Sequence, residues 1–159
     1  MCLAPPDLVR EAWKLEGFQD IRKMEKGDFL LIGKRERHTH NTWMHNAEGL
    51  ARGETTNYLY IHPEDGAAKG ISQGDLVIVS GPGEDRIEVP CRFTLDLKRG
   101  VVALPHGWGH RYPAGWSKAV KRPGVNVNRL LSDSVLKLEP VAGVAWMNGI
   151  PVDIEPAKG

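Results

Sequence analysis

The sequence is poor in cysteine: Cys2 and Cys91 are its only two, and they lie far apart with no C-x-x-C spacing. Two distant cysteines argue against a disulfide framework and against a cysteine-ligated zinc site. We therefore expect a reducing compartment, the cytoplasm, with Cys91 as a lone buried cysteine within a strand.

The sequence also lacks any apolar run near the roughly 18 residues that a membrane-spanning helix requires. Its opening, MCLAPPDLVREAWKLEG, has neither the basic start nor the apolar stretch of a signal peptide. We expect no membrane partner and no export.

A strong charge of one sign is missing too, because the formal net charge of the 159 residues is +1. Such a chain has no basic field of the kind that dominates nonspecific nucleic-acid binding, so we expect no nucleic-acid partner. An anionic ligand would have to be held by local groups. At this length, with 41% hydrophobic residues, the chain fits one globular core.

Glycine and proline are frequent, at 18 and 11 residues, and they leave room only for short elements between them. Most of these elements have the alternation or the short apolar runs typical of β-strands, and the turn at 82–85 predicts a hairpin. Pro151 predicts that the last strand lies at an edge, because proline removes a ladder donor. Extended segments are expected at 28–34, 57–63, 74–81, 86–95, 100–107, 124–130 and 144–156.

Two segments predict helix instead. In 7–17, apolar residues recur at helical spacing, with Asp7 as the expected N-cap and Gly17 as the stop. Residues 63–70 predict one or two helical turns. We expect residues 1–27 to form an N-terminal helical leader and residues 28–159 a mainly β domain, a closed barrel or a sandwich.

Five strings in order then resemble one family: DFLLIGKRERHTHNTWMHN, YLYIHPEDGAAKGISQGDLVIVS, VVALPHGWGH, GVNVNRLLSD and WMNGIPVDIEP. Over about residues 28–154 the chain is similar to the C-terminal molybdopterin-dinucleotide-binding domain of the molybdenum/tungsten oxidoreductases related to formate dehydrogenase and dimethyl sulfoxide reductase. The resemblance implies a six-stranded double-psi β-barrel with short helices, preceded by the helical appendage. The leader LAPPDLV resembles the segment before this domain in longer members, which implies an excised domain or a split subunit.

The first candidate site is the loop RHTHNTWMHN, residues 37–46. Asparagine amides and neutral histidines match the mixed donors and acceptors of a pterin or guanine edge, while a pyrophosphate needs charged donors such as Lys34, Arg35 and Arg37. A polar surface loop with histidines that cap nearby backbone is the alternative. By resemblance, the residues that contact bis(molybdopterin guanine dinucleotide) here are His38, His40, Asn41, Trp43 and Asn46, and we add Arg37 as a charged donor to the pyrophosphate.

The second candidate is LPHGWGH, in which Gly107 and Gly109 flank Trp108. Such glycines let backbone approach a ligand closely or adopt a positive φ; a tight turn with a tryptophan lid on the core is the alternative. The family places this string beside the cofactor, which implies contact by His106, Gly107, Trp108 and His110.

The third candidate is GVNVNRLLSD, in which Asn126 and Asn128 alternate with valines. In an extended chain both amides would point to one side and the valines to the core, although asparagine often bonds turn backbone instead. The resemblance favours Asn126 as a cofactor contact, with Asn128 second, and Asp133 fits the acidic position after this string.

A protein-ligated metal is a competing reading of the histidines. His38 and His40 would share one face of an extended chain, and another histidine could complete a zinc site. The glycines in PHGWGH argue against the helical geometry that would align His106 with His110. The remaining histidines in this reading are His45 and His62.

Three functions follow as expectations. The first is a cofactor-holding domain or small subunit of a formate-dehydrogenase-like molybdopterin oxidoreductase, which shares the bis(molybdopterin guanine dinucleotide) cofactor, with Mo or W, with the remaining domains or a large subunit. By resemblance the metal-ligating residue and the iron–sulfur motif belong to those other domains, so the chain alone is not expected to be catalytic. The alternatives are a zinc hydrolase that uses the histidines and a noncatalytic barrel that serves as an interaction module.

Overall fold

The computed structural model describes residues 5–14, 28–50, 52–82, 86–111, 116–132, 134, 138 and 143–157. Within them lie the α-helices α1 and α3, the short 3₁₀ helices η2, η3 and η4, and six strands. In chain order the elements are α1 (Pro6–Lys14), β1 (Phe29–Lys34), η2 (Trp43–Asn46), β2 (Leu59–Ile61), α3 (Pro63–Ala68), β3 (Leu76–Ser80), β4 (Arg86–Phe93), β5 (Val101–Pro105), η3 (Ala119–Lys121), η4 (Val127–Leu130) and β6 (Ile150–Pro156).

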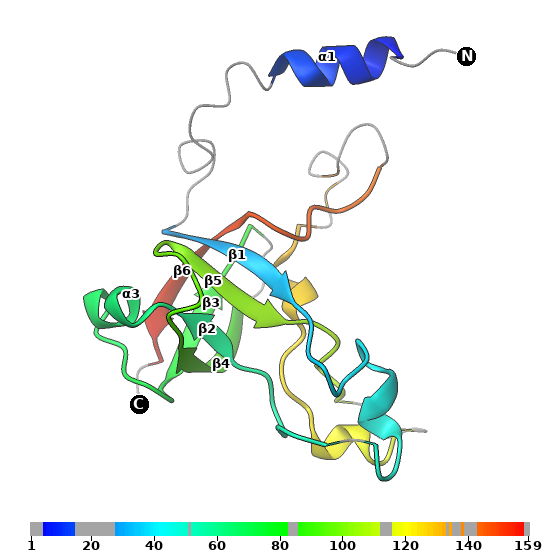
Figure 1. Cartoon of the computed structure of the whole chain (residues 1–159), viewed down its shortest axis with the longest axis vertical. Helices are drawn as coiled ribbons and strands as arrows, with labels where there is room; N and C mark the ends of the chain where they lie inside the picture. Colours follow the sequence, from blue (N-terminus) through cyan, green and yellow to red (C-terminus); the bar gives the residue numbers. More distant parts are fainter. Residues whose placement is uncertain are drawn as a thin grey trace.

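The strands form a closed barrel in the order β1-β5-β2-β4-β3-β6, as Figure 1 shows. The pairs β1–β5 and β2–β4 are parallel, and the other four pairs are antiparallel. The expected hairpin is confirmed, since β3 and β4 pair antiparallel; the turn residues 83–85 lie outside the described residues. The expectation of a mainly β, six-stranded barrel is therefore confirmed.

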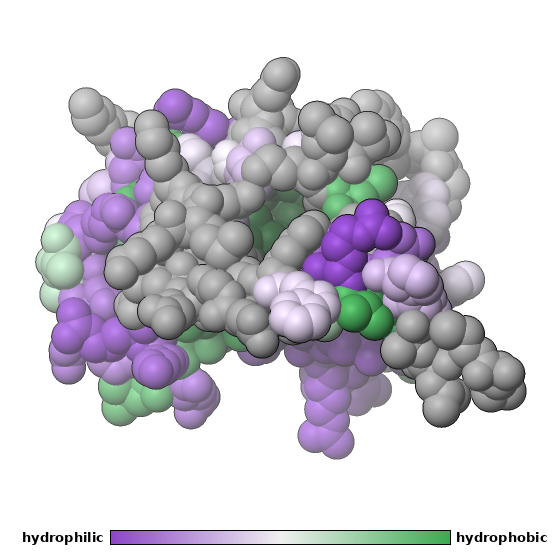
Figure 2. Space-filling view, turned by 90° about the horizontal axis from the view of Figure 1, so that it is seen from above, coloured by the Kyte–Doolittle hydropathy of each residue, from purple (hydrophilic) through white to green (hydrophobic). Residues whose placement is uncertain are grey.

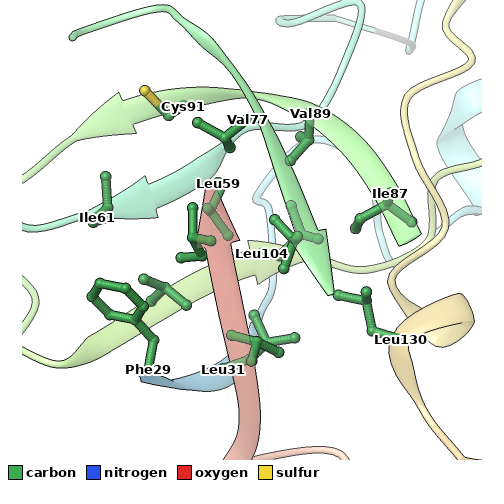
Figure 3. Packing of buried hydrophobic residues seen from close by; sticks show 14 of the residues in the cluster. Phe29, Leu31, Leu59, Ile61, Val77, Ile87, Val89, Cys91, Leu104 and Leu130 are labelled. Atoms are coloured by element: carbon green, nitrogen blue, oxygen red, sulfur yellow. The ribbon is translucent and has the colours of Figure 1, made fainter. Parts of the chain in front are cut away.

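The barrel interior is filled mainly by aliphatic side chains, which alternate with more exposed residues along every strand except β5, where residues 102–105 are all buried. Leu59 and Ile61 are fully buried on β2 while Tyr60 between them is only half-buried, as period-2 geometry requires. Figure 3 shows labelled side chains from several strands and from η4 converging on one core, among them Leu31, Leu104 and Leu130. Cys91 belongs to this core and is a free thiol, as expected, and burial raises its pKa.

The last strand is not an edge strand, so that expectation is wrong. β6 pairs with β1 on one side and with β3 on the other, which closes the barrel. The register explains why Pro151 is tolerated: Pro151 faces Leu30 of β1, whereas the pairing with β3 begins only at Asp153. The proline thus stands where β6 has one neighbour, and its missing donor interrupts no ladder on the β3 side.

Residues 127–130 also differ from the expectation of an extended segment, because they form the 3₁₀ helix η4. Val127 is nevertheless buried and Val125 packs against the core, while both asparagines are exposed. Alternation therefore identified the buried side of this segment correctly but its backbone conformation wrongly.

Helix α1 begins two residues earlier than an N-cap at Asp7 would place it, at Pro6. Asp7 lies within its first turn, where it forms an ion pair with Arg10 and is not the N-cap. Gly17, the expected stop, and residue 27, the last of the expected leader, lie outside the described residues. Among the helices that the structure describes, none combines the length and the apolarity needed to cross a bilayer.

Helix α3 matches its expectation: Pro63 is its first residue, and Gly70 follows it with a φ of +69°. His62 is the N-cap, and its Nδ1 accepts a hydrogen bond from the Glu64 amide at 3.2 Å. A Cβ at Gly66 would lie 2.5 Å from the Phe93 ring, so glycine allows α3 to pack on β4.

The surface of the described residues is mixed. Figure 2 shows hydrophilic residues over most of the coloured surface of one face, with hydrophobic residues in small patches. The large hydrophobic side chains that are exposed come from several parts of the chain and are Leu8, Val9, Trp13, Trp43, Leu50, Leu76, Leu95, Trp116, Val144, Trp146 and Met147.

Candidate functional site

The barrel topology brings the first two candidate segments together. β1 and β5 are parallel with Lys34 opposite Pro105, so the segments that follow them leave the barrel at the same end. The His106 amide donates to the Lys34 carbonyl at 3.3 Å, which continues the pairing past the strand ends. In Figure 1 the loop after β1 lies beside the segment that contains η3, on the side of the barrel away from α3.

Asn57 fixes a third segment at this end. It is fully buried just before β2, and its amide group donates to the carbonyls of Pro105 and Val125, each at 3.0 Å. Its Oδ1 accepts from the Val125 amide at 2.9 Å. One side chain thus satisfies three backbone groups and joins the end of β5 to the segment before η4.

The two glycines of LPHGWGH allow the three segments to touch. Gly107 has a φ of +85°, and a Cβ there would lie 2.0 Å from the Asn41 carbonyl oxygen. Gly109 has a φ of +103°, and a Cβ there would lie 2.6 Å from that of Asn126. The close backbone approach expected of these glycines is therefore made to other parts of the chain. We call residues 36–46, 106–110 and 116–126 the loop junction.

Side-chain hydrogen bonds cross the loop junction. Asn41 Oδ1 lies 3.0 Å from His106 Nε2. Asn46 Oδ1 accepts from the amides of Lys118 and Ala119 at 3.0 and 3.2 Å, at the start of η3. These contacts hold the first loop in place through its asparagines, whereas the alternative reading gave the capping of nearby backbone to its histidines.

Trp108 is buried within the loop junction, as the reading of a tryptophan lid predicts. Its side chain is 5% exposed, and its Nε1 donates to Glu36 Oε2 at 2.9 Å. The indole packs against the ring of His45, with 4.4 Å between the ring centroids. The glutamate satisfies the polar edge of a large apolar group, as buried tryptophans require.

His45 and His110 form a contact at the centre of the loop junction. His45 Nδ1 lies 2.9 Å from His110 Nε2, and Thr42 Oγ1 lies 3.0 Å from the same His110 nitrogen. Burial, together with the positive charges of His110 and Arg122, lowers the pKa of His45 from 6.5 to about 4. His45 is therefore neutral at pH 7.

Several predicted site residues have exposed side chains. Trp43 is 75% exposed, and His40 and Asn41 have the positive φ values of +44° and +62° that mark a sharp turn. Asn126 Oδ1 accepts from the Asn128 amide at 3.0 Å, which caps η4. The predicted residues with exposed side chains are Arg37, His38, His40, Asn41, Trp43, Asn126 and Asn128.

The histidines were also considered as ligands of a metal ion. Across the described ranges, which include all six histidines, no group of three or more His, Cys, Asp or Glu side chains gathers in a way that could hold a metal ion. Asp133 lies outside the described residues.

Sequence reasoning missed residues whose roles depend on distant partners. Glu36, Thr42 and Asn57 hold the loop junction together, and Trp116 stacks on His110 with 5.6 Å between ring centroids and 9° between planes. His45 was considered only as a metal ligand. Asparagine just before a strand is a weak signal, because it is more typical of an ordinary turn.

Comparison with known proteins identifies the family. Residues 29–148 match the model of the family described as Molydopterin dinucleotide binding domain, a range that includes β1 to β5 and the whole loop junction. The chain is 28% identical over 115 residues to a subunit of tetrathionate reductase from Salmonella typhimurium, and the match covers 62% of this chain and 11% of that protein.

A solved structure shares the fold. Acetylene hydratase from Pelobacter acetylenicus aligns with a TM-score of 0.68 at 19% sequence identity, over 98% of this chain and 20% of that chain. The chain thus spans about a tenth to a fifth of the length of these two relatives. Neither the zinc hydrolase nor the interaction module finds support in these matches. The chain belongs to the Molydopterin dinucleotide binding domain family.

Proposed function

We propose that the chain binds the guanine form of the cofactor, bis(molybdopterin guanine dinucleotide) with Mo or W, on the outer side of the loop junction. It does so as a C-terminal domain or small subunit of a larger, formate-dehydrogenase-like oxidoreductase. Family membership supports a molybdopterin dinucleotide, and the small share of its relatives' length supports a larger enzyme. The double-psi form of the barrel is part of this proposal, and the two parallel strand pairs support it.

One observation carries the proposal: strands β1 and β5 deliver two polar segments to the same end of the barrel, where hydrogen bonds fix them to each other. A rigid first layer of contacts is what a binding site for a large, polar ligand requires, because less ordering remains to be done when the ligand binds.

The exposed donors fit the cofactor. Arg37, His38 and His40 offer cationic or neutral hydrogen-bond donors to a diphosphate, and the exposed Trp43 offers a flat face to a heterocycle. When bound, the metal and its pterins supply the redox chemistry, while this chain binds and orients them. Turnover of formate is thus expected only of the assembled enzyme.

The test is a titration of the full chain with GDP, followed by backbone-amide NMR, with ADP as the control nucleotide. We expect saturable, GDP-selective shifts within residues 37–46, 106–110 and 126–128. Arg37→Gln should weaken GDP binding at least about tenfold, because a charge-assisted hydrogen bond contributes about 1.5–3 kcal/mol. Lys98→Gln is the matched control: Lys98 is exposed and precedes β5, whereas the site follows the other end of that strand.

Equal shifts with ADP would contradict selectivity for guanine. An absence of shifts from these three segments at millimolar GDP would contradict the proposed site.

A further inference from the structure

The burial of His45 costs folding free energy. Its side chain is 1% exposed, and its Nε2 is buried without a hydrogen-bond partner among the described residues. A buried polar atom without a partner costs free energy, so packing alone does not favour histidine over an apolar residue there. The useful atom of this ring is therefore the other nitrogen, Nδ1.

Among the described residues, Nδ1 has one hydrogen-bonding contact, with His110. The two rings meet edge to face, with 86° between their planes, and the Nδ1 to Nε2 distance of 2.9 Å requires one hydrogen between the two nitrogens. Thr42 adds its hydroxyl at 3.0 Å from the same His110 atom. His110 Nε2 is thus tied to the interior of the loop junction by two side chains.

The stack of Trp116 on His110 does not determine which ring nitrogen of His110 faces inward. Trp116 stacks on the imidazole with 9° between planes, and such stacking holds the plane of the ring. A half-turn of the imidazole about its bond to Cβ would keep this stack but remove Nε2 from His45 and Thr42. The hydrogen bonds alone decide which edge of the ring faces inward.

We propose that His45 is a positioning residue for His110: with Thr42 it fixes Nε2 inward, so that Nδ1 of His110 is presented in one tautomer to an oxygen or nitrogen of the dinucleotide. This inference rests on the proposed function, because it assigns the ligand of His110 to the same site. The neutral state of His45 at pH 7 supports it, since a cationic His45 would repel any positive charge on its partner.

Two variants of His45 separate positioning from packing. In His45→Asn the amide lies close to where Nδ1 was, so it can still bond His110, and the atom without a partner is removed. In His45→Gln the amide lies one bond further out, near the place of Nε2, so the bond to His110 is lost. Both replacements are neutral amides, so a role in packing alone would not distinguish them in this order.

The readout is the ring-nitrogen NMR spectrum of His110 in the full chain labelled with ¹⁵N-histidine, which reports the tautomer without any ligand. We expect one fixed tautomer in the wild type and in His45→Asn, and averaged signals in His45→Gln. GDP affinity should fall about fivefold in His45→Gln relative to His45→Asn, the effect of one lost hydrogen bond. Thermal melting of both variants confirms that each is folded.

Two results would overturn the inference: a fixed His110 tautomer in His45→Gln, or equal GDP affinity in the two folded variants that differ in tautomer. If the wild type binds no GDP, the proposed function fails instead, and the tautomer measurement still decides whether His45 positions His110.

Discussion

The barrel and the loop junction are held together by different kinds of interaction. The barrel core consists of aliphatic side chains on paired strands, such as Leu31 and Leu104, whose burial is nondirectional and tolerant of small shifts. The loop junction is held by directional hydrogen bonds from Asn57, Thr42 and His45, each of which needs its partner at one distance and angle. From this contrast we expect stability to reside mainly in the barrel, and the shape of the candidate site to depend on a few polar contacts.

The largest effect is expected in the barrel. Leu104 is fully buried on β5, one residue before the strand end to which Asn57 is bonded. Leu104→Ala should lower the free energy of unfolding by about 2–5 kcal/mol, because it removes apolar contacts and leaves a cavity. Urea denaturation followed by circular dichroism measures this change.

Leu95→Ala is the control for this prediction. Leu95 is 79% exposed, so the same deletion of atoms should change the free energy of unfolding by no more than about 0.5 kcal/mol. A loss below about 1 kcal/mol in Leu104→Ala would show that the barrel does not dominate stability.

The next effect is a pH dependence that arises in the loop junction. The native state holds the pKa of His45 at about 4, whereas in the unfolded chain it returns to 6.5. Between pH 4 and 6.5, His45 is therefore protonated in the unfolded chain but neutral in the native state. The contribution of His45 to the free energy of unfolding is therefore fully present above pH 6.5. It is lost as the pH drops toward 4, which lowers the free energy of unfolding by up to about 3 kcal/mol.

The difference between the unfolding free energies of the wild type and His45→Asn, measured from pH 4 to 7.5, isolates this contribution from that of other titrating groups. The wild-type value should fall more steeply between pH 6.5 and 4. Parallel curves would mean that His45 accepts a proton as easily in the native state as in the unfolded chain.

The smallest effect on stability is expected on the outer side of the loop junction. Trp43 is 75% exposed, so Trp43→Ala should leave the free energy of unfolding within about 0.5 kcal/mol of the wild type. Its GDP affinity should fall at least fivefold if the indole stacks on the base, since such stacking contributes about 1–3 kcal/mol. Isothermal titration calorimetry measures the affinity.

Leu50→Ala, another exposed position after the same loop, should change neither quantity. A loss of more than about 1 kcal/mol of stability in Trp43→Ala would place Trp43 among the residues that hold the junction together.

The same contrast explains what could be predicted from the sequence. Barrel strands have a local pattern: apolar residues two apart, as at Leu59 and Ile61, predict a buried face whatever their partners are. The prediction that β6 is an edge strand was wrong because it rested on Pro151 alone, without the pairing register of the strand. That register depends on where β1 and β3 begin and end.

The loop junction could be predicted in outline only. Resemblance pointed to the segments that meet, but local sequence could not separate the buried His45 from the exposed His38 and His40 in the same loop. That separation depends on Trp108 and His110, more than sixty residues away along the chain, as the contacts between them show. Likewise, nothing near Asn57 indicates that it bonds Val125.

The closure of the barrel limits how this chain can join other polypeptides. Within the described part of the chain each of the six strands pairs with two others, so the ring leaves only short stretches, such as the one at Pro151, open to a seventh strand. Association by β-augmentation, and the aggregation that exposed ladders invite, are thereby disfavoured in the barrel. We therefore expect a larger assembly to contact the barrel through its loops and side chains, by docking of folded surfaces and not by addition of a strand.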